Sequence, residues 1–194
     1  MKDYQDYLQE ELLFDATITE RFPPFFIYGF NVKRSAEKIV AGIEFLHGST
    51  GGRLYYQDYS GTYVADQLIS LNSIGLTCEW YFYSKETLHL YGGLKILGIL
   101  HGLKIQNSLE LINFPRIEEN ADFYSFNLGL QPFLTLKKEI KKVFFEASIG
   151  YELQSKADTK YKEDKESFLS GRDGTPVYLQ STGLRACMGI GLIF

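Results

Sequence analysis

The stretch that decides the fold is "GLRACMGIGLIF", residues 183–194, because its hydrophobic residues alternate strictly with others. Counting back from Phe194, every second residue is apolar, and the residues between them include Gly189, Gly191 and Arg185. A period of two over a run of this length predicts a β-strand with one bulky hydrophobic face and one compact face that carries a charge. The apolar set is Phe194, Leu192, Ile190, Met188, Ala186 and Leu184.

The same alternation recurs in seven further segments, so the sequence predicts eight strands. Residues 12–20 form the weakest of these segments, and we expect residues 1–10 before it to be disordered or helical. Pro132 lies inside another segment and predicts a β-bulge there, because proline cannot donate a ladder hydrogen bond. The seven segments are residues 12–20, 25–32, 38–46, 72–82, 88–96, 122–136 and 143–153.

The composition favours an all-β chain and argues against several classes of protein. The 194 residues include 18 Gly and 15% aromatic residues, and we expect one domain over residues 1–194. The net charge of -4 argues against a nucleic-acid partner. Two cysteines give no disulfide framework, and no apolar stretch reaches the roughly 18 residues of a membrane helix. Since no metal, nucleotide or nucleophile motif occurs, we expect no metal, no cofactor and no catalytic residues.

The two faces of the strands are better explained with lipid outside than with water outside. The apolar face is uniformly bulky, whereas the other face mixes Gly, Ser, Thr, Asn and single charges, which suits the narrow interior of a closed barrel. We expect the interior carboxylates to pair with two cations, which leaves one negative charge in excess. Because such an interior has room only for side chains, we expect a structural plug in preference to an ion path. The predicted interior charges are Glu44, Glu79, Lys95, Glu146 and Arg185.

The connections between the predicted strands alternate in length. Short charged turns are predicted at residues 33–36, 83–86 and 137–142, and long polar loops at residues 49–70, 106–121 and 154–176. Short turns on one side and long loops on the other are typical of an up-and-down antiparallel transmembrane β-barrel. Tyrosines in the first long loop either form a binding surface or cap the mouth of the barrel. They are Tyr55, Tyr56, Tyr59 and Tyr63.

In size and pattern the chain resembles the small eight-stranded outer-membrane β-barrels of Gram-negative bacteria, which are OmpA-like or OmpX-like. Its end is similar to the assembly signal of that family, with Cys187, Gly189, Leu192 and Phe194 in the signal's positions. The resemblance implies a monomer in the cell outer membrane that contacts outer-membrane lipid and, through its last strand, the barrel-assembly machinery. It implies a structural or adhesive protein, neither an enzyme nor an open pore. The first residues lack a signal-peptide pattern, so either the protein is not exported or the numbering follows removal of that peptide.

Two alternatives stay open at this point. A soluble calycin-like barrel that binds a small hydrophobic ligand would have an apolar interior without charges. An outer-membrane enzyme that modifies lipid would need a histidine close to a serine and an acid at one rim. The histidines are His47, His89 and His101, and His101 with Ser125 is the best-placed candidate pair.

Overall fold

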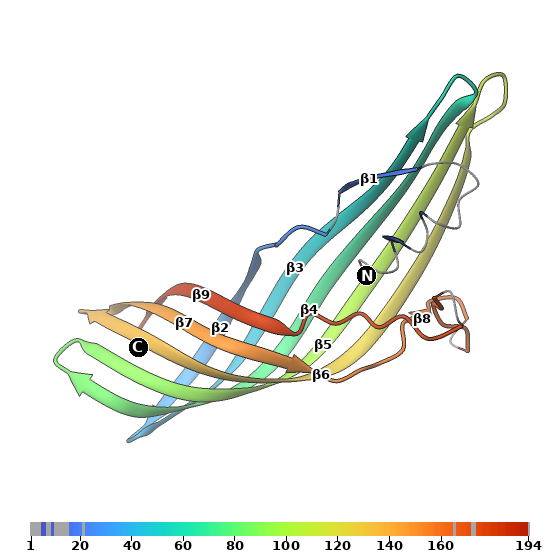
Figure 1. The fold of residues 1–194 in the computed structure, drawn as a ribbon. Helices are drawn as coiled ribbons and strands as arrows, with labels where there is room; N and C mark the ends of the chain where they lie inside the picture. The colour runs from blue at the N-terminus through green and yellow to red at the C-terminus, as the bar shows by residue number, and fades with distance from the viewer. Residues whose placement is uncertain are drawn as a thin grey trace.

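The computed structural model describes residues 5–6, 9, 16–20, 22–164, 166–171 and 174–193, and its strands form a single nine-stranded β-sheet (Figure 1). The sequence-based prediction of an all-β antiparallel fold is therefore confirmed. The strands are β1 (Thr17–Glu20), β2 (Ile27–Ala36), β3 (Ile39–Gln57), β4 (Gly61–Lys85), β5 (Leu88–Leu111), β6 (Ile117–Ile140), β7 (Val143–Gln154), β8 (Lys160–Tyr161) and β9 (Gly183–Leu192).

The main strands follow one another in the sheet in the order in which they occur in the chain. The path β2–β3–β4–β5–β6–β7–β9 is antiparallel throughout. At one end, two-residue turns join three of the pairs, with Glu37, Glu86 and Lys141 each at a positive φ. Residues 33–36 are therefore not a turn, as predicted, but the end of β2. We call this end of the sheet the turn end.

The sheet has two parts, because β3 to β6 are about twice as long as β2, β7 and β9. In the first part all seven strands curl into a half-barrel, which we call the wall, and its concave side is the interior (Figure 1). In the second part β3 to β6 continue without their neighbours as a flatter four-stranded sheet, which we call the extension. The extension comprises residues 49–57, 61–70, 101–111 and 117–124.

The extension corrects two of the predicted loops. Residues 49–70 and 106–121 are mostly strand, and the connections shrink to residues 58–60 and 112–116. The pairing of β3 with β4 runs without a register shift from Ile39 to Gln57. Polar side chains do not prevent this, because the ladder is formed by backbone groups and the side chains project from the two faces of the sheet.

The third long connection, residues 155–182, is largely irregular as predicted and folds back on the extension. Within it β8 pairs with Phe123 and Tyr124 of β6. Leu169 and Leu179 pack with Leu103 and Ile105 of β5 into a buried hydrophobic cluster. The connection therefore covers one face of the extension and gives it a small core of its own.

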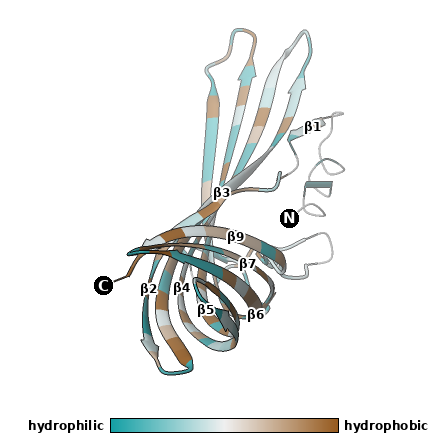
Figure 2. Ribbon diagram, turned by 90° about the vertical axis from the view of Figure 1, so that its left-hand side faces the viewer, coloured by the Kyte–Doolittle hydropathy of each residue, from teal (hydrophilic) through white to brown (hydrophobic). Residues whose placement is uncertain are grey.

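In the wall, the predicted orientation of the two faces is confirmed. Leu128, Ile149 and Ile190 point away from the interior and are 59%, 51% and 70% exposed, whereas Glu79 and Asn127 are 3% and 0% exposed. Figure 2 shows the most hydrophobic residues concentrated on the wall strands, while the extension is mostly pale or teal. The wall therefore inverts the usual arrangement of a water-soluble sheet, which buries its large hydrophobic residues.

The wall has seven strands among the described residues, one fewer than predicted. Of the predicted strand over residues 12–20, Thr17–Glu20 forms β1, which pairs with β3 in the extension, and residues 12–15 lie outside the described part of the chain. In the described part, β2 pairs only with β3 and β9 only with β7. The predicted bulge at Pro132 is wrong: the register with β7 is the same on both sides of it, although Gln131 and Pro132 are not paired to that strand.

Candidate functional site

Charged side chains from different strands meet inside the wall. Lys95 of β5 binds Glu44 of β3, with 2.7 Å between Nζ and Oε2. Lys33 of β2 lies between two carboxylates, 2.7 Å from Glu79 Oε1 on β4 and 3.1 Å from Glu146 Oε2 on β7. Since β2 and β7 lie near opposite ends of the sheet path, this last contact spans the interior and links the two sides of the curl.

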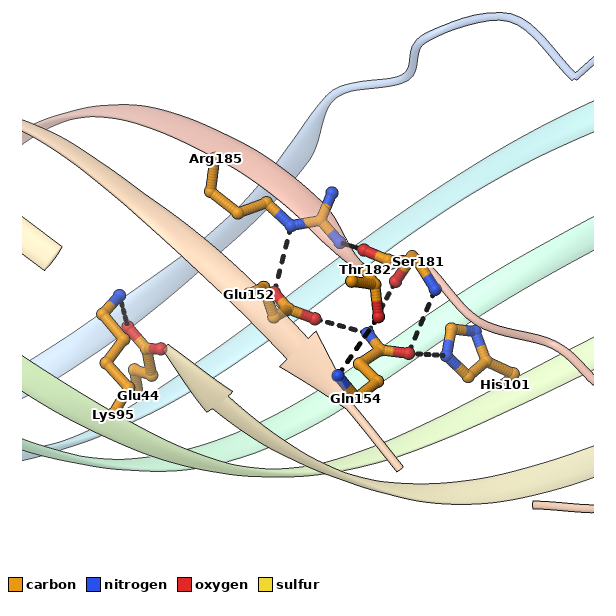
Figure 3. A network of polar contacts seen from close by, with 8 residues as sticks. All are labelled: Glu44, Lys95, His101, Glu152, Gln154, Ser181, Thr182 and Arg185. Carbon is orange, nitrogen blue, oxygen red and sulfur yellow. Dashed lines mark hydrogen bonds and ion pairs between the residues drawn. The ribbon is translucent and has the colours of Figure 1, made fainter. Parts of the chain in front are cut away.

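A second network lies nearer to the extension (Figure 3). Arg185 of β9 binds Glu152 of β7, with 3.0 Å between Nε and Oε2, and also donates to the carbonyl of Ser181. Gln154 donates to Glu152 and to Ser181 Oγ, the latter at 2.7 Å. Its Oε1 lies 3.3 Å from His101 Nε2. Each side chain in this network thus has a hydrogen-bond or ion-pair partner within it. Such partners allow charged groups to remain buried.

The structure places all five predicted interior charges on the concave side, but their pairing differs from the prediction. Arg185 pairs with Glu152, and two predicted carboxylates share Lys33. With these two added residues the ion pairs just described join four carboxylates and three cations, one negative charge in excess. The alternation of the strands could have shown that Lys33 and Glu152 face the interior. Lys33 lies two residues after Asn31, and Glu152 two residues after Gly150, so each falls on the polar face of its strand.

The interior also contains a small apolar cluster of Leu71, Leu97 and Ile99. Leu97 occupies the space that the absent side chain of Gly75 leaves free. A Cβ at Gly75 would come within 2.6 Å of Leu97 Cδ2, which is too close. Leucine and isoleucine therefore sit beside ion pairs, whereas the soluble calycin-like alternative required an interior without charges.

The predicted catalytic pair is not assembled as a nucleophile and its base. His101 and Ser125 are cross-strand neighbours, but His101 contacts Gln154, and Ser125 Oγ lies within hydrogen-bond distance of two acceptors, Asn127 Oδ1 and the carbonyl of Ala157. Both side chains are buried, at 2% and 1% exposure.

The other two histidines lie elsewhere. His89 Nδ1 is 2.8 Å from Ser84 Oγ at the turn end, but its Nε2 is 3.7 Å from Glu139, too far for an orienting hydrogen bond. His47 contacts Asn72 at 2.7 Å. The described residues include no group of His, Cys, Asp and Glu side chains that could hold a metal ion.

The four predicted binding tyrosines are divided over the tip of the β3–β4 hairpin. Tyr56 and Tyr63 are a cross-strand pair on one face, Tyr55 is on the other face, and Tyr59 is 91% exposed in the turn. Tyr56 donates to Asp58 Oδ2 at 2.9 Å. The four rings therefore do not form one surface, and the tip presents chiefly Tyr59.

The same end of the extension carries exposed apolar residues from the β5–β6 hairpin. Ile112 and Phe114 are 62% and 68% exposed, and the amide of Ile112 donates to the carbonyl of Ser60 at 3.0 Å. The two hairpin tips therefore lie side by side and form one outer end, which sequence reasoning missed because it treated residues 106–121 as a loop.

The residues of the predicted assembly signal lie on β9 or beyond it. Leu192 faces outward and is 59% exposed, whereas Gly189 faces Glu146, where a Cβ would meet the Glu146 side chain at 3.1 Å. Phe194 lies outside the described residues.

Comparison with known proteins gives no relative: no family model, curated protein or solved structure matches the chain. Among the residues that the structure describes, no helix has the length and hydrophobicity needed to cross a membrane.

Proposed function

We propose that the protein is a monomeric outer-membrane β-barrel whose wall spans the lipid bilayer and whose extension projects from the cell surface in a structural or adhesive role. The observation that carries this proposal is the belt of exposed hydrophobic residues around the wall, which we call the apolar belt. So many Leu, Ile and Phe side chains are unfavourable in contact with water. Removing one of them from water stabilises the protein by about 1.5–3 kcal/mol.

The height of the apolar belt fits a bilayer. Its outward-facing residues occupy 74–82 in β4, 126–136 in β6 and 145–153 in β7. These segments agree with the roughly 9–11 residues that a tilted strand needs to cross the hydrocarbon core. Ion pairs and buried side chains such as those of Asn127 and Gln131 occupy the interior, which favours a plugged barrel over an open pore.

We propose that the wall closes with an eighth strand. Because the seven wall strands alternate in direction, β2 and β9 run the same way, and one strand that runs the opposite way would pair with both as an antiparallel neighbour. A second copy of the chain with the same orientation in the membrane could pair its β2 or β9 with these edges only in parallel. Residues 12–20, which precede β2 and alternate in hydrophobicity, are the natural eighth strand. For residues 12–20 to join the wall, Thr17–Glu20 would have to separate from β3. The present pairing of Thr17–Glu20 with β3 includes a register shift.

The extension supports an adhesive role, because it is long and has a core of its own. At about 3.3 Å per residue, residues 61–70 carry the hairpin tips about 30 Å beyond the wall. A rigid sheet with exposed Tyr59 and Phe114 at its end provides aromatic contact area at little cost in conformational entropy. The natural contact partner of this end would lie outside the cell.

The proposal is tested by the sidedness of the two ends in a Gram-negative host. In a chain without its own thiols (C78A and C187A), Tyr59→Cys marks the tip and Glu86→Cys marks the turn end. We expect a membrane-impermeant maleimide to label Tyr59→Cys on intact cells and Glu86→Cys only after the outer membrane is permeabilised. Recovery of the protein in the soluble fraction, or equal labelling of both positions on intact cells, would refute the proposal.

A further inference from the structure

The turn end of the wall carries a high density of positive charge. Residues 34–38, 84–87 and 137–142 contain seven Lys and Arg against three Glu, a net charge of +4 in a chain whose net charge is -4. The two hairpins of the extension, residues 49–70 and 101–124, contain three basic and six acidic residues, a net charge of -3. Charge is thus polarised along the molecule, with cations at one edge of the apolar belt and an acidic excess beyond the other.

Most of these cations are free to bind an external partner. Lys137 is the exception, because it pairs with Glu139 at 2.9 Å and lies over the ring of Phe144. The remaining six side chains are exposed, and none has an ion pair with any residue that the structure describes. They belong to three separate hairpins and follow the edge of the wall: Arg34, Lys38, Lys85, Lys138, Lys141 and Lys142.

The cations lie directly beside the apolar belt. Ile39, Leu88 and Ile140 are outward-facing hydrophobic residues within one or two positions of the three turns, and all three are exposed. On β4, Trp80 and Phe82 are 42% and 66% exposed close to Lys85. Aromatic rings beside long basic side chains are typical of the boundary between hydrocarbon and headgroups, where the aliphatic stems cover apolar surface and the charges reach the phosphates.

We propose that the turn end is a binding surface for anionic phospholipid headgroups in the leaflet that it contacts, an inference that rests on the proposed membrane location. Each Lys or Arg near an anionic membrane surface adds to the attraction, and salt screens it within a Debye length. Exposed Lys104 and Lys160 lie beyond the opposite edge, but Arg53 there is paired with Asp66 and the two hairpins of the extension carry a net negative charge, so that edge has no excess of cations. The two leaflets would therefore be recognised differently, which favours one orientation of the barrel.

Trp80 provides a direct reporter, since it is the single tryptophan of the chain and faces outward near the turn end. The full chain is reconstituted in vesicles of equal phosphatidylcholine and phosphatidylglycerol, with bromine, which quenches tryptophan fluorescence, on the acyl chains of one lipid or the other. We expect brominated phosphatidylglycerol to quench Trp80 about three times as strongly as brominated phosphatidylcholine. This ratio should fall towards one in about 0.5 M salt. The variant K85Q/K138Q/K141Q/K142Q should lose the preference in the same way.

The matched control is K104Q/R116Q/K160Q/K162Q, which removes four exposed positive charges from the side of the extension and should keep the preference of the unchanged chain. Both variants must retain β-sheet circular dichroism and resistance to unfolding by detergent without heating. If each brominated lipid quenches the unchanged chain equally, the headgroup inference is wrong while the membrane location stands. If neither lipid quenches Trp80, the proposed function fails as well.

Discussion

The wall and the extension are built largely from the same four strands, yet they present opposite surfaces. Along β5, Ile96 and Leu100 point outward from the wall, whereas Lys104 and Gln106 occupy the same row in the extension. The inward row mixes Lys95 with buried Leu97 and Ile99 in the wall, and it carries buried Leu103 and Ile105 in the extension. The outward row thus changes from apolar in the wall to polar in the extension, and in the proposed membrane protein this change marks the edge of the bilayer.

The largest expected difference between the two parts concerns their ion pairs. Glu44→Leu leaves Lys95 inside the wall without its carboxylate, and we expect a loss of about 3–5 kcal/mol in the free energy of unfolding. Asp66→Leu breaks the exposed pair with Arg53 in the extension and should cost less than about 1 kcal/mol. Urea titration in lipid vesicles measures both changes. Equal losses would mean that the interior of the wall is as wet as the surface of the extension.

Charges placed on the outward rows come next in size. Leu128→Arg puts a cation in the middle of the apolar belt and should destabilise the protein in bilayers by about 2–4 kcal/mol. Gln106→Arg, on the outward row of the extension, should change stability by less than about 0.5 kcal/mol. The same titration measures this difference, and a harmless Leu128→Arg would argue against lipid at that position.

The small core of the extension should unfold separately from the wall. Leu179→Ala removes a fully buried side chain from its contacts with Leu103 and Leu169, at a cost of about 2–3 kcal/mol. We expect limited proteolysis to cut residues 155–182 faster while the wall strands stay protected. Loss of protection throughout the wall would show that the two parts form one cooperative unit.

Closure of the wall can be followed by hydrogen exchange. In a bilayer, an eighth strand would protect the backbone amides of β2 and β9 that point away from β3 and β7. Ile18→Pro removes a donor from the proposed closing strand and should speed exchange at those amides more than at the central strands β4 and β5. Rapid exchange along both edges in the unchanged chain would mean that the wall stays open.

The smallest effect is a pH dependence confined to the tip. Hydrogen bonds from Ser60, first from its hydroxyl and then from its amide, lower the pKa of Asp58 below the ordinary value of 3.8. Because the folded-state pKa is depressed, this support of the turn is complete above pH 3.8 and is lost as the pH falls through the lowered pKa. Amide chemical shifts of Ser60 and Gly61 should follow that titration, and they should not do so in Asp58→Asn.

The wall could be predicted from the sequence because its information is local. Period-two alternation located most of its strands, and the contrast of bulky and small faces gave the orientation of residues such as Leu128 and Ile190. The extension was missed for a related reason. Leu103 and Ile105 alternate with Lys104 and Gln106 as in any soluble sheet, but polar residues between two predicted membrane strands were interpreted as a loop.

The details of the site depended on information that no single strand contains. The partner of Arg185 is Glu152 because β7 and β9 are neighbours, and Lys33 reaches Glu146 because the sheet curls. Such contacts depend on register and curvature over distant parts of the chain, which alternation does not specify. For the same reason the sequence could not show that Thr17–Glu20 pairs with β3 in the extension.

The measurement that tests the account most directly is the state of the purified protein with and without detergent. Size-exclusion chromatography with light scattering should find aggregates in plain buffer and a single monomeric species in detergent micelles, because only an apolar solvent satisfies the belt around the wall. A monodisperse, folded monomer in water would contradict the claim that this hydrophobic surface faces lipid.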